Sequence, residues 1–168
     1  MHESKLPPLR FSPIDLARRE DVCIAFRRDS YVLSFGTFDG VESQMGPDNQ
    51  TYLRHLRRFI SQVPEGNTHV WLNGEIIGQT EMSLVKDPTI GYVNLFYLVK
   101  ACRNQGLGAQ LHTYACNLFR AKGKSQLNLS VSPTNLPAHA FYKKHGWTSL
   151  GPRPNGANVI LMAYQNSI

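Results

Sequence analysis

The sequence predicts one domain of the α+β class, in which helices flank a mixed sheet. The chain has 168 residues, a usual length for a single domain with a substantial core. Its middle third reads as three consecutive strands, which favours an antiparallel run. A helical segment then separates these strands from later ones, and such a crossover is what places two strands in parallel.

Composition and charge are those of an ordinary globular protein. Hydrophobic residues make up 42% of the chain, too many for a disordered segment. No apolar run reaches the roughly 20 residues of a membrane span, and the first residues lack the apolar region of a secretory signal. Cys23, Cys102 and Cys116 are widely spaced and form no zinc pattern. We therefore expect a cytoplasmic protein with free thiols, no metal and no membrane contact.

The first residues are expected to form a short strand and a helix. Residues 9–11 read as the strand. Ser12 and Pro13 follow as a helix-start signal, an N-cap hydroxyl and then a proline at the first helical position. The helix is expected over residues 13 to about 28.

A loop and a second helix are expected next. Residues 34–46 are rich in glycine and turn formers and read as the loop. Pro47 and Asp48 begin the second helix, which ends before Pro64. Its apolar side shows helical spacing and consists of Tyr52, Leu53, Leu56, Phe59 and Ile60.

The middle of the chain is expected to be a strand meander. Residues 69–72 and 75–84 flank Asn73 and Gly74, a strong signal for a two-residue hairpin. Residues 90–99 are apolar at nearly every position, which is typical of a central strand buried on both faces.

The last third alternates between helices and strands. A helix is expected over residues 106–121, closed by Gly123, and a strand over 126–131. Asn135 and Pro137 open a short helix that closes at Gly146. Two final strands are expected at 147–150 and 159–164.

The segment from Leu98 to Leu111 combines a strand end, a glycine turn and a helix start. The first N–H groups of a helix have no internal partner and carry partial positive charge, and glycines allow a phosphate to approach the backbone closely. The chain has no Asp or Glu after Asp87, although that part contains Lys100, Arg103, Arg120, Lys122, Lys124, Lys143, Lys144 and Arg153. The segment therefore predicts a site for a phosphate or pyrophosphate.

Two common phosphate motifs do not fit this segment. A dinucleotide fingerprint needs a third glycine where Leu111 stands, and an acid about 20 residues later, which is missing. A P-loop would end at Gly123-Lys124-Ser125, but Leu118 occupies the place of its first glycine, and a helix precedes it instead of a strand.

A third pattern does fit. Arg103-x-x-Gly106-x-Gly108 after a central strand resembles the R/Q-x-x-G-x-G/A motif of the GNAT superfamily of N-acetyltransferases. Residues 135–147, with Asn135, Ala138, Phe141-Tyr142-Lys143-Lys144 and Gly146-Trp147, are similar to a second signature of that family. The resemblance covers about residues 68–147. It implies a GNAT-like fold: a mostly antiparallel twisted sheet with one splayed strand pair and about four helices.

The resemblance implies acetyl-CoA as co-substrate, without a metal. The pyrophosphate would be bound by Arg103, Asn104, Gln105, Gly106, Leu107, Gly108 and Ala109. The pantetheine arm would pair with the strand at Tyr97 and Leu98, and the N–H near Leu98 would face the thioester carbonyl. Asn135 would contact the arm, although it is equally a helix N-cap, and Tyr142 would lie near the sulfur.

The implied reaction is acetyl transfer to a primary amine by direct attack through a tetrahedral intermediate. Tyr142 is the expected acid for the departing CoA thiolate. Glu81 is the expected base, directly or through a water that Asn94 would orient. The alternatives for the base are His112, His139 and His145.

The resemblance leaves the acceptor open, whether a small molecule or a peptide. Residues 1–67 would form the acceptor side, 68–150 the acetyl-CoA-binding core and 151–168 a C-terminal strand of one 168-residue domain. Two acids and three aromatic residues in the first connection suit an amine-bearing cation: Tyr31, Phe35, Phe38, Asp39 and Glu42. Homodimers are frequent in the family. A non-catalytic acyl-CoA-binding domain is the alternative, and no nucleic acid is expected as a partner.

Overall fold

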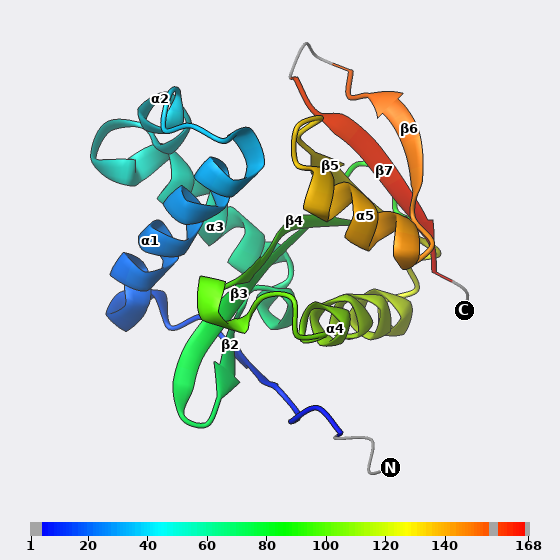
Figure 1. Cartoon of the computed structure of the whole chain (residues 1–168), viewed down its shortest axis with the longest axis horizontal. Helices are drawn as coiled ribbons and strands as arrows, with labels where there is room; N and C mark the ends of the chain where they lie inside the picture. Colours follow the sequence, from blue (N-terminus) through cyan, green and yellow to red (C-terminus); the bar gives the residue numbers. More distant parts are fainter. Residues whose placement is uncertain (1–4, 155–157, 167–168) are drawn as a thin grey trace.

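The protein is described from a computed structural model over residues 5–154 and 158–166, which contain one mixed sheet covered by helices on both faces (Figure 1). The strands are β1 (Arg10–Pro13), β2 (Thr68–Leu72), β3 (Glu75–Leu84), β4 (Ile90–Leu98), β5 (Gln126–Val131), β6 (Thr148–Pro152) and β7 (Ile160–Gln165). The helices are α1 (Leu16–Phe35), α2 (Val41–Met45), α3 (Gln50–Gln62), α4 (Gly108–Ala121) and α5 (Leu136–Lys144), with short 3₁₀ turns η1 (Pro47–Asn49), η2 (Pro64–Gly66) and η3 (Lys100–Cys102).

The sheet confirms the predicted class and the predicted crossover. Its strand order is β1-β2-β3-β4-β5-β7-β6, and β4 with β5 is the parallel pair, joined through α4. The other neighbouring pairs are antiparallel. The parallel pairing covers only Ile90 to Val93 against Gln126 to Leu129. Beyond these residues β4 and β5 separate, as Figure 1 shows.

The predicted start of the first helix is wrong. Ser12 and Pro13 belong to β1, where Ser12 is the register partner of His69 on β2. The helix begins at Leu16 and continues to Phe35, where Gly36 in the left-handed region (φ +70°) forms the C-cap. Strand pairing satisfies the backbone of Ser12, so its N-cap potential is not used. The expected loop over residues 34–46 also contains the short helix α2.

The β2–β3 hairpin and the central strand follow the prediction. Asn73 and Gly74 both have positive φ, +52° and +80°, as a type I′ turn requires. Between β3 and β4 the register shifts, because Glu81 faces Leu95 while Met82 faces Val93. Asn94 is therefore an extra residue, a β-bulge at the place where β4 leaves β5.

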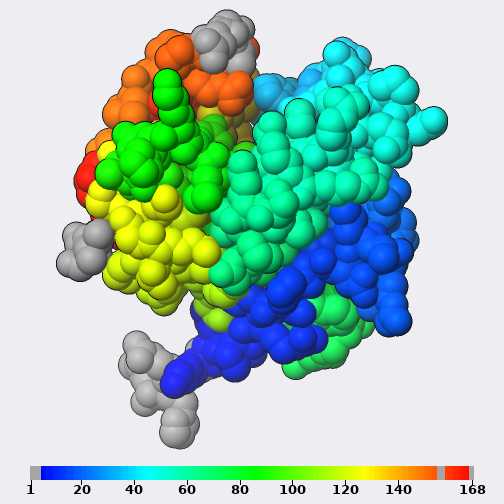
Figure 2. Space-filling model, turned by 180° about the vertical axis from the view of Figure 1, so that it is seen from behind, coloured from blue at the N-terminus to red at the C-terminus, as the bar shows by residue number. Residues whose placement is uncertain are grey.

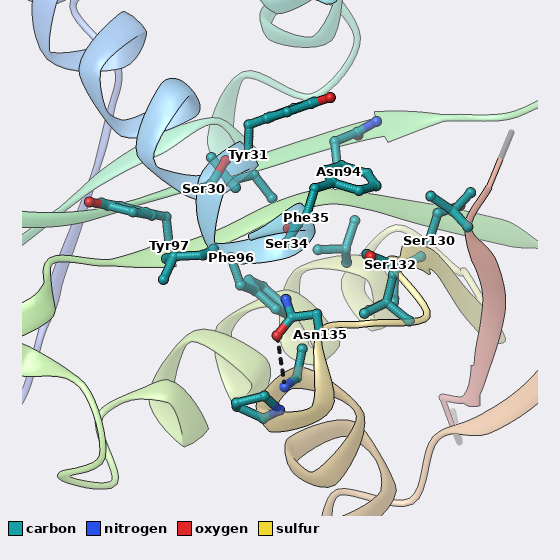
Figure 3. Close-up of a pocket in the computed structure, with 18 of the residues that line it drawn as sticks. Ser30, Tyr31, Ser34, Phe35, Asn94, Phe96, Tyr97, Ser130, Ser132 and Asn135 are labelled. Atoms are coloured by element: carbon teal, nitrogen blue, oxygen red, sulfur yellow. Dashed lines mark hydrogen bonds between the residues drawn. The ribbon is translucent and has the colours of Figure 1, made fainter. Parts of the chain in front are cut away.

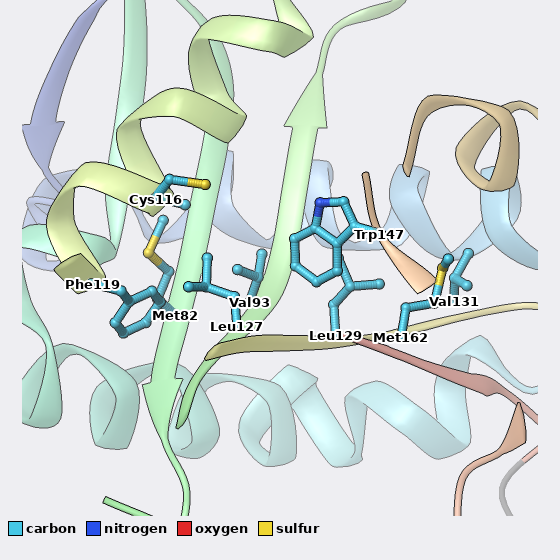
Figure 4. Close-up of a cluster of buried hydrophobic side chains, with 10 residues drawn as sticks. Met82, Val93, Cys116, Phe119, Leu127, Leu129, Val131, Trp147 and Met162 are labelled. Atoms are coloured by element: carbon cyan, nitrogen blue, oxygen red, sulfur yellow. The ribbon is translucent and has the colours of Figure 1, made fainter. Parts of the chain in front are cut away.

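A hydrophobic core lies between the sheet and helix α4 (Figure 4). Its buried members are Met82, Val93, Ala115, Cys116, Phe119, Leu127, Leu129, Val131, Trp147 and Met162. The packing is tight at Gly91, where an added Cβ would lie 2.4 Å from the Phe119 ring. A separate core packs α1, α2 and α3 together and includes Cys23, Leu53 and Leu56. The two cores hold helices on opposite faces of the sheet.

On the far side of the molecule, shown in Figure 2, α3 and η2 lie next to α4. There the chain around residue 65 lies beside the C-terminal part of α4. Tyr114 donates a hydrogen bond to the Glu65 carbonyl (2.5 Å), and Lys122 forms an ion pair with the Glu65 carboxylate (3.1 Å). These contacts fix the helix that follows the glycine turn.

Three further findings concern the described residues. None of their helices is both long and apolar enough to pass through a lipid bilayer. Their His, Cys, Asp and Glu side chains form no group of three that could hold a metal ion. Cys23, Cys102 and Cys116 are free thiols, as the sequence predicts.

Candidate functional site

The separation of β4 and β5 opens a pocket of about 730 Å³ (Figure 3). Its walls come from the C-terminal part of α1, the second half of β4, the end of β5, the glycine turn and the start of α5. Figure 3 shows Asn94, Phe96 and Tyr97 along one side, with Asn135 at the N-terminus of α5.

One edge of β4 carries main-chain groups that no strand pairs. The N–H of Val99 donates to the Ile77 carbonyl on β3 (2.8 Å). Because N–H groups alternate in direction along a strand, those of Phe96 and Leu98 are directed away from β3, toward the opening. β5 has already separated there. This edge can accept an extended ligand as an additional strand.

The glycine turn lies at one end of this edge. Asn104 and Gly106 both have positive φ, +59° and +82°, which bends the chain sharply before α4 begins at Gly108. Asn104 and Gly108 line the pocket. Leu107 is buried instead and packs with Val70 and Leu111, which anchors the turn to the sheet.

Other residues of the predicted turn face elsewhere. Gln105 donates to the Ala101 carbonyl (2.7 Å). Gly106 and Ala109 line a second, separate hollow. Leu6 of the N-terminal segment also lines this hollow. The structure therefore brings Arg103, Asn104 and Gly108 to the main pocket, and leaves the others in the same turn but beside it.

Arg103 is held by a partner that the sequence analysis did not identify. Its Nη2 contacts Oδ2 of Asp29 on α1 (2.9 Å), and its Nε donates to the Leu98 carbonyl (2.8 Å). The Tyr97 hydroxyl donates to the same Asp29 oxygen (2.5 Å). The three side chains join helix α1 to β4 and to the glycine turn. No local pattern marks Asp29, because its partners lie 68 and 74 positions away.

Asn135 and Tyr142 bring α5 to the pocket, as the sequence predicts. The Asn135 side-chain oxygen accepts from the Ala138 N–H (3.3 Å), so the residue is the N-cap of α5 and also lines the pocket. Tyr142 lines the pocket with its ring near Trp147. Burial raises the pKa of the Tyr142 phenol above its ordinary value of 10, which keeps the hydroxyl protonated.

The proposed base and its alternatives lie outside the residues that line this pocket. Glu81 is 0% exposed, and its Oε2 accepts from the Tyr52 hydroxyl and from Gln79, both at 2.7 Å. Its other oxygen, Oε1, is buried with no hydrogen-bond partner. Asn94 does line the pocket and accepts from the Ser83 hydroxyl (2.8 Å).

Each alternative histidine has a structural partner. His112 accepts from Trp147 Nε1 (2.9 Å), and burial together with the neighbouring His145 lowers its pKa to about 4. His139 contacts the Ser132 carbonyl (3.0 Å), and His145 contacts the Phe141 carbonyl (2.8 Å). Among the described lining residues there is neither a histidine nor a carboxylate.

Of the five residues expected to face the acceptor, only two line the pocket. Tyr31 and Phe35 line the pocket. Phe38 is 69% exposed, and neither Asp39 nor Glu42 is a lining residue. Glu42 instead pairs with Arg28, with an Nη1–Oε1 distance of 2.7 Å.

Sequence reasoning also missed several residues of this wall. They are Arg27, Ser30, Ser34, Tyr92, Ser130 and Ser132. These residues are scattered along the sequence and form no recognisable motif, so only the folded chain brings them together.

The arrangement combines a glycine turn before a helix N-terminus, a free strand edge and a protonated phenol in the wall of one pocket. Such a site is suited to a long ligand that carries a phosphate and to donation of a proton.

Comparison with known families agrees with this geometry. Residues 28–147 match the family model described as "Acetyltransferase (GNAT) family". A search of curated proteins finds no match to the chain.

Solved structures with the same fold are numerous. PaiA N-acetyltransferase from Thermoplasma acidophilum, in complex with coenzyme A, has a TM-score of 0.75 at 16% identity and covers 95% of this chain and 99% of its own. The ribosomal-protein-S18-alanine N-acetyltransferase from Escherichia coli has a TM-score of 0.65 at 17% identity, covering 96% of each chain. N-acetylglutamate synthase from Neisseria gonorrhoeae, complexed with coenzyme A and N-acetyl-glutamate, has a TM-score of 0.68 at 12% identity, covering 98% of this chain and 36% of its own.

Proposed function

Because the chain belongs to the acetyltransferase (GNAT) family and is an acyltransferase, we propose that its pocket transfers an acetyl group from acetyl-CoA to a primary amine. Coenzyme A is bound in two of the similar structures. The whole described chain would act as one domain, with residues 1–67 on the acceptor side.

The donor half of the proposal rests on the strand edge and the turn. The pyrophosphate would meet the backbone of residues 103–109, where Gly106 provides the bend and α4 begins. The pantetheine arm would pair along β4, toward the bulge at Asn94. One of its amide carbonyls would accept from the N–H of Leu98, which faces away from β3 beyond the end of the β4–β5 pairing.

The thioester lies at the far end of that arm, so it would lie near the point where β4 leaves β5. As the amine attacks, the carbonyl oxygen gains negative charge, and the N–H of Phe96, the free edge group nearer the splay, would stabilise it, while the N–H of Leu98 would pair with the arm. The tetrahedral intermediate then collapses, the C–S bond breaks, and the Tyr142 hydroxyl gives its proton to the departing thiolate. The buried phenol is protonated at neutral pH, so it has a proton to donate, and its place in the pocket wall supports this role.

The amine must lose a proton before or during attack. Glu81 remains the proposed base, acting through water, because its Oε1 has no partner and can hold one. Asn94 lies in the pocket wall and would orient the water nearer the amine. The cytoplasmic location expected from the sequence, and a homodimer, stay predictions.

The observation that carries the proposal is the pocket at the splay of β4 and β5, with the glycine turn, Asn135 and Tyr142 in its wall. The test is to measure free thiol released from acetyl-CoA with a panel of amines. Thiol release that depends on the amine supports the enzyme. Tight binding of coenzyme A by calorimetry, without release for any amine, would favour the alternative of a non-catalytic acyl-CoA-binding domain.

A further inference from the structure

The charged residues in the described wall of the pocket are all cationic. They are Arg27, Arg103 and Arg153, and no Asp or Glu is among the described lining residues. A polyamine or another polycation would therefore find repulsion there and no counter-charge. The wall is instead suited to an anion.

The three arginines differ in what already neutralises them. Arg103 is paired with Asp29 (2.9 Å). Arg27 is partly buried and has no carboxylate within ion-pair distance among the described residues. One of its N–H groups donates to the Asn94 carbonyl (3.3 Å), and its guanidinium lies over the Tyr52 ring, 5.9 Å from the centroid. A guanidinium has five N–H donors, so most of them remain for a ligand.

The position of Arg27 limits where that anion can be. Asn94, to which it donates, is the bulged residue at the splay. The proposed reaction also takes place at the splay, so the attacking amine must come close to this guanidinium. An anion on the acceptor can therefore reach Arg27 only if a few bonds separate it from the amine.

The rest of the acceptor wall suits a small molecule with an apolar part. The rings of Tyr31, Phe35 and Tyr92 contribute apolar surface. The same pocket is also lined by five serines, which can offer hydroxyl groups: Ser30, Ser34, Ser43, Ser130 and Ser132. Arg153, an exposed residue, donates weakly to Ser130 (3.4 Å).

We propose that the acceptor is an amine with a carboxylate close to it, of which an α-amino acid is the simplest case, and that Arg27 binds this carboxylate. This inference rests on the proposed acetyl transfer and specifies its acceptor class. A carboxylate fits a guanidinium in a bidentate manner, which would also orient the amine toward the thioester.

The test compares each of a panel of L-amino acids with its own carboxamide, by thiol release from acetyl-CoA. The expected kcat/KM ratio of acid to amide is about ten- to a hundredfold, the range of a charge-assisted hydrogen bond. The amine of the carboxamide loses its proton more easily than that of the free acid, which by itself favours transfer to the amide. A preference for the acid would therefore be observed against this bias. Spermidine is expected to be a poor acceptor.

Arg27→Gln is expected to lower the acid-to-amide ratio at least tenfold, and Arg27→Lys to lower it less. Turnover of the amide shows that each variant is folded. Arg18→Gln is the matched control, because this α1 side chain is 84% exposed and lies outside the lining residues. An unchanged ratio in Arg27→Gln, or transfer to amides and polyamines but not to amino acids, overturns the inference and leaves acetyl transfer standing. Absence of thiol release with every amine overturns the proposed function and this inference with it.

Discussion

Replacing Tyr142 by Phe is expected to remove most of the turnover and almost none of the stability. No hydrogen bond joins the Tyr142 hydroxyl to another described group, while its ring lies 5.5 Å from Trp147 and 5.4 Å from Phe141. Phe keeps these ring contacts, so the free energy of unfolding should change by no more than about 0.5 kcal/mol. Loss of a general acid typically costs about 10²- to 10⁴-fold, which corresponds to roughly 3–5 kcal/mol in the barrier.

The assay is thiol release at saturating acetyl-CoA and acceptor, with calorimetry for coenzyme A binding and urea unfolding for stability. Tyr164→Phe is the control, because that ring also lies 5.5 Å from Trp147 but is not part of the pocket wall. It should retain its turnover. If Tyr142→Phe turns over as fast as the parent protein, the hydroxyl is not the acid. If it loses turnover and stability together, the packing argument fails.

Three further outcomes are expected from residues outside the donor turn. His112 has a pKa of about 4 in the fold against an ordinary 6.5, so as pH falls the unfolded chain binds the proton first. The free energy of unfolding should therefore decrease below pH 6.5, by about 3 kcal/mol once pH is below 4. Urea unfolding at pH 7 and pH 5 should show a smaller loss of stability in His112→Gln than in the parent. Gly91→Ala should cost about 1–3 kcal/mol in urea unfolding, because its Cβ would meet the Phe119 ring; an unchanged midpoint would mean that the ring moves freely. Glu81→Gln should remove the acidic limb of the pH–rate profile if Glu81 is the base, and an unaltered profile would exclude it.

The local structure at the proposed donor end of the pocket could be predicted because short segments build it. The strand, the turn and the start of α4 lie within residues 90–121, so the six-residue motif from Arg103 to Gly108 indicates them together. The Asn135 N-cap is equally local, since its partner Ala138 is three residues away. The hairpin at Asn73 and Gly74 was fixed by the φ angles that those two residues tolerate.

The limits of the first helix could not be predicted in the same way. Ser12 and Pro13 have the chemistry of a helix start, but pairing between β1 and β2 determines their conformation. The helix ends at Phe35 and is capped by Gly36. Gly36 is a typical C-cap residue, but it stands in a turn-rich stretch that reads as a loop.

The face of the sheet on which Glu81 lies, and therefore its partners, could not be predicted for another reason. All seven residues of β3 from Ile77 to Ser83 are buried, so this part of the strand shows no alternation of exposed and buried residues. Without alternation, the sequence does not indicate which face of the sheet a side chain occupies. The structure directs Glu81 to Tyr52 on α3.

If the proposed function holds, helix α1 would contribute an acceptor specificity that the donor motifs do not encode. Its Arg27 and Asp29 reach β4 through contacts with Asn94 and Tyr97, 67 and 68 positions away. A substitution at either position leaves the glycine turn, the strand edge and Tyr142 unchanged in sequence. Chains with the same donor motifs can therefore share the acetyl-transfer chemistry and differ in the acceptor. Under the proposed function, the Arg27 guanidinium, which has no carboxylate partner among the described residues, would separate an amino acid from a polyamine, and position 27 is where that choice should be altered first.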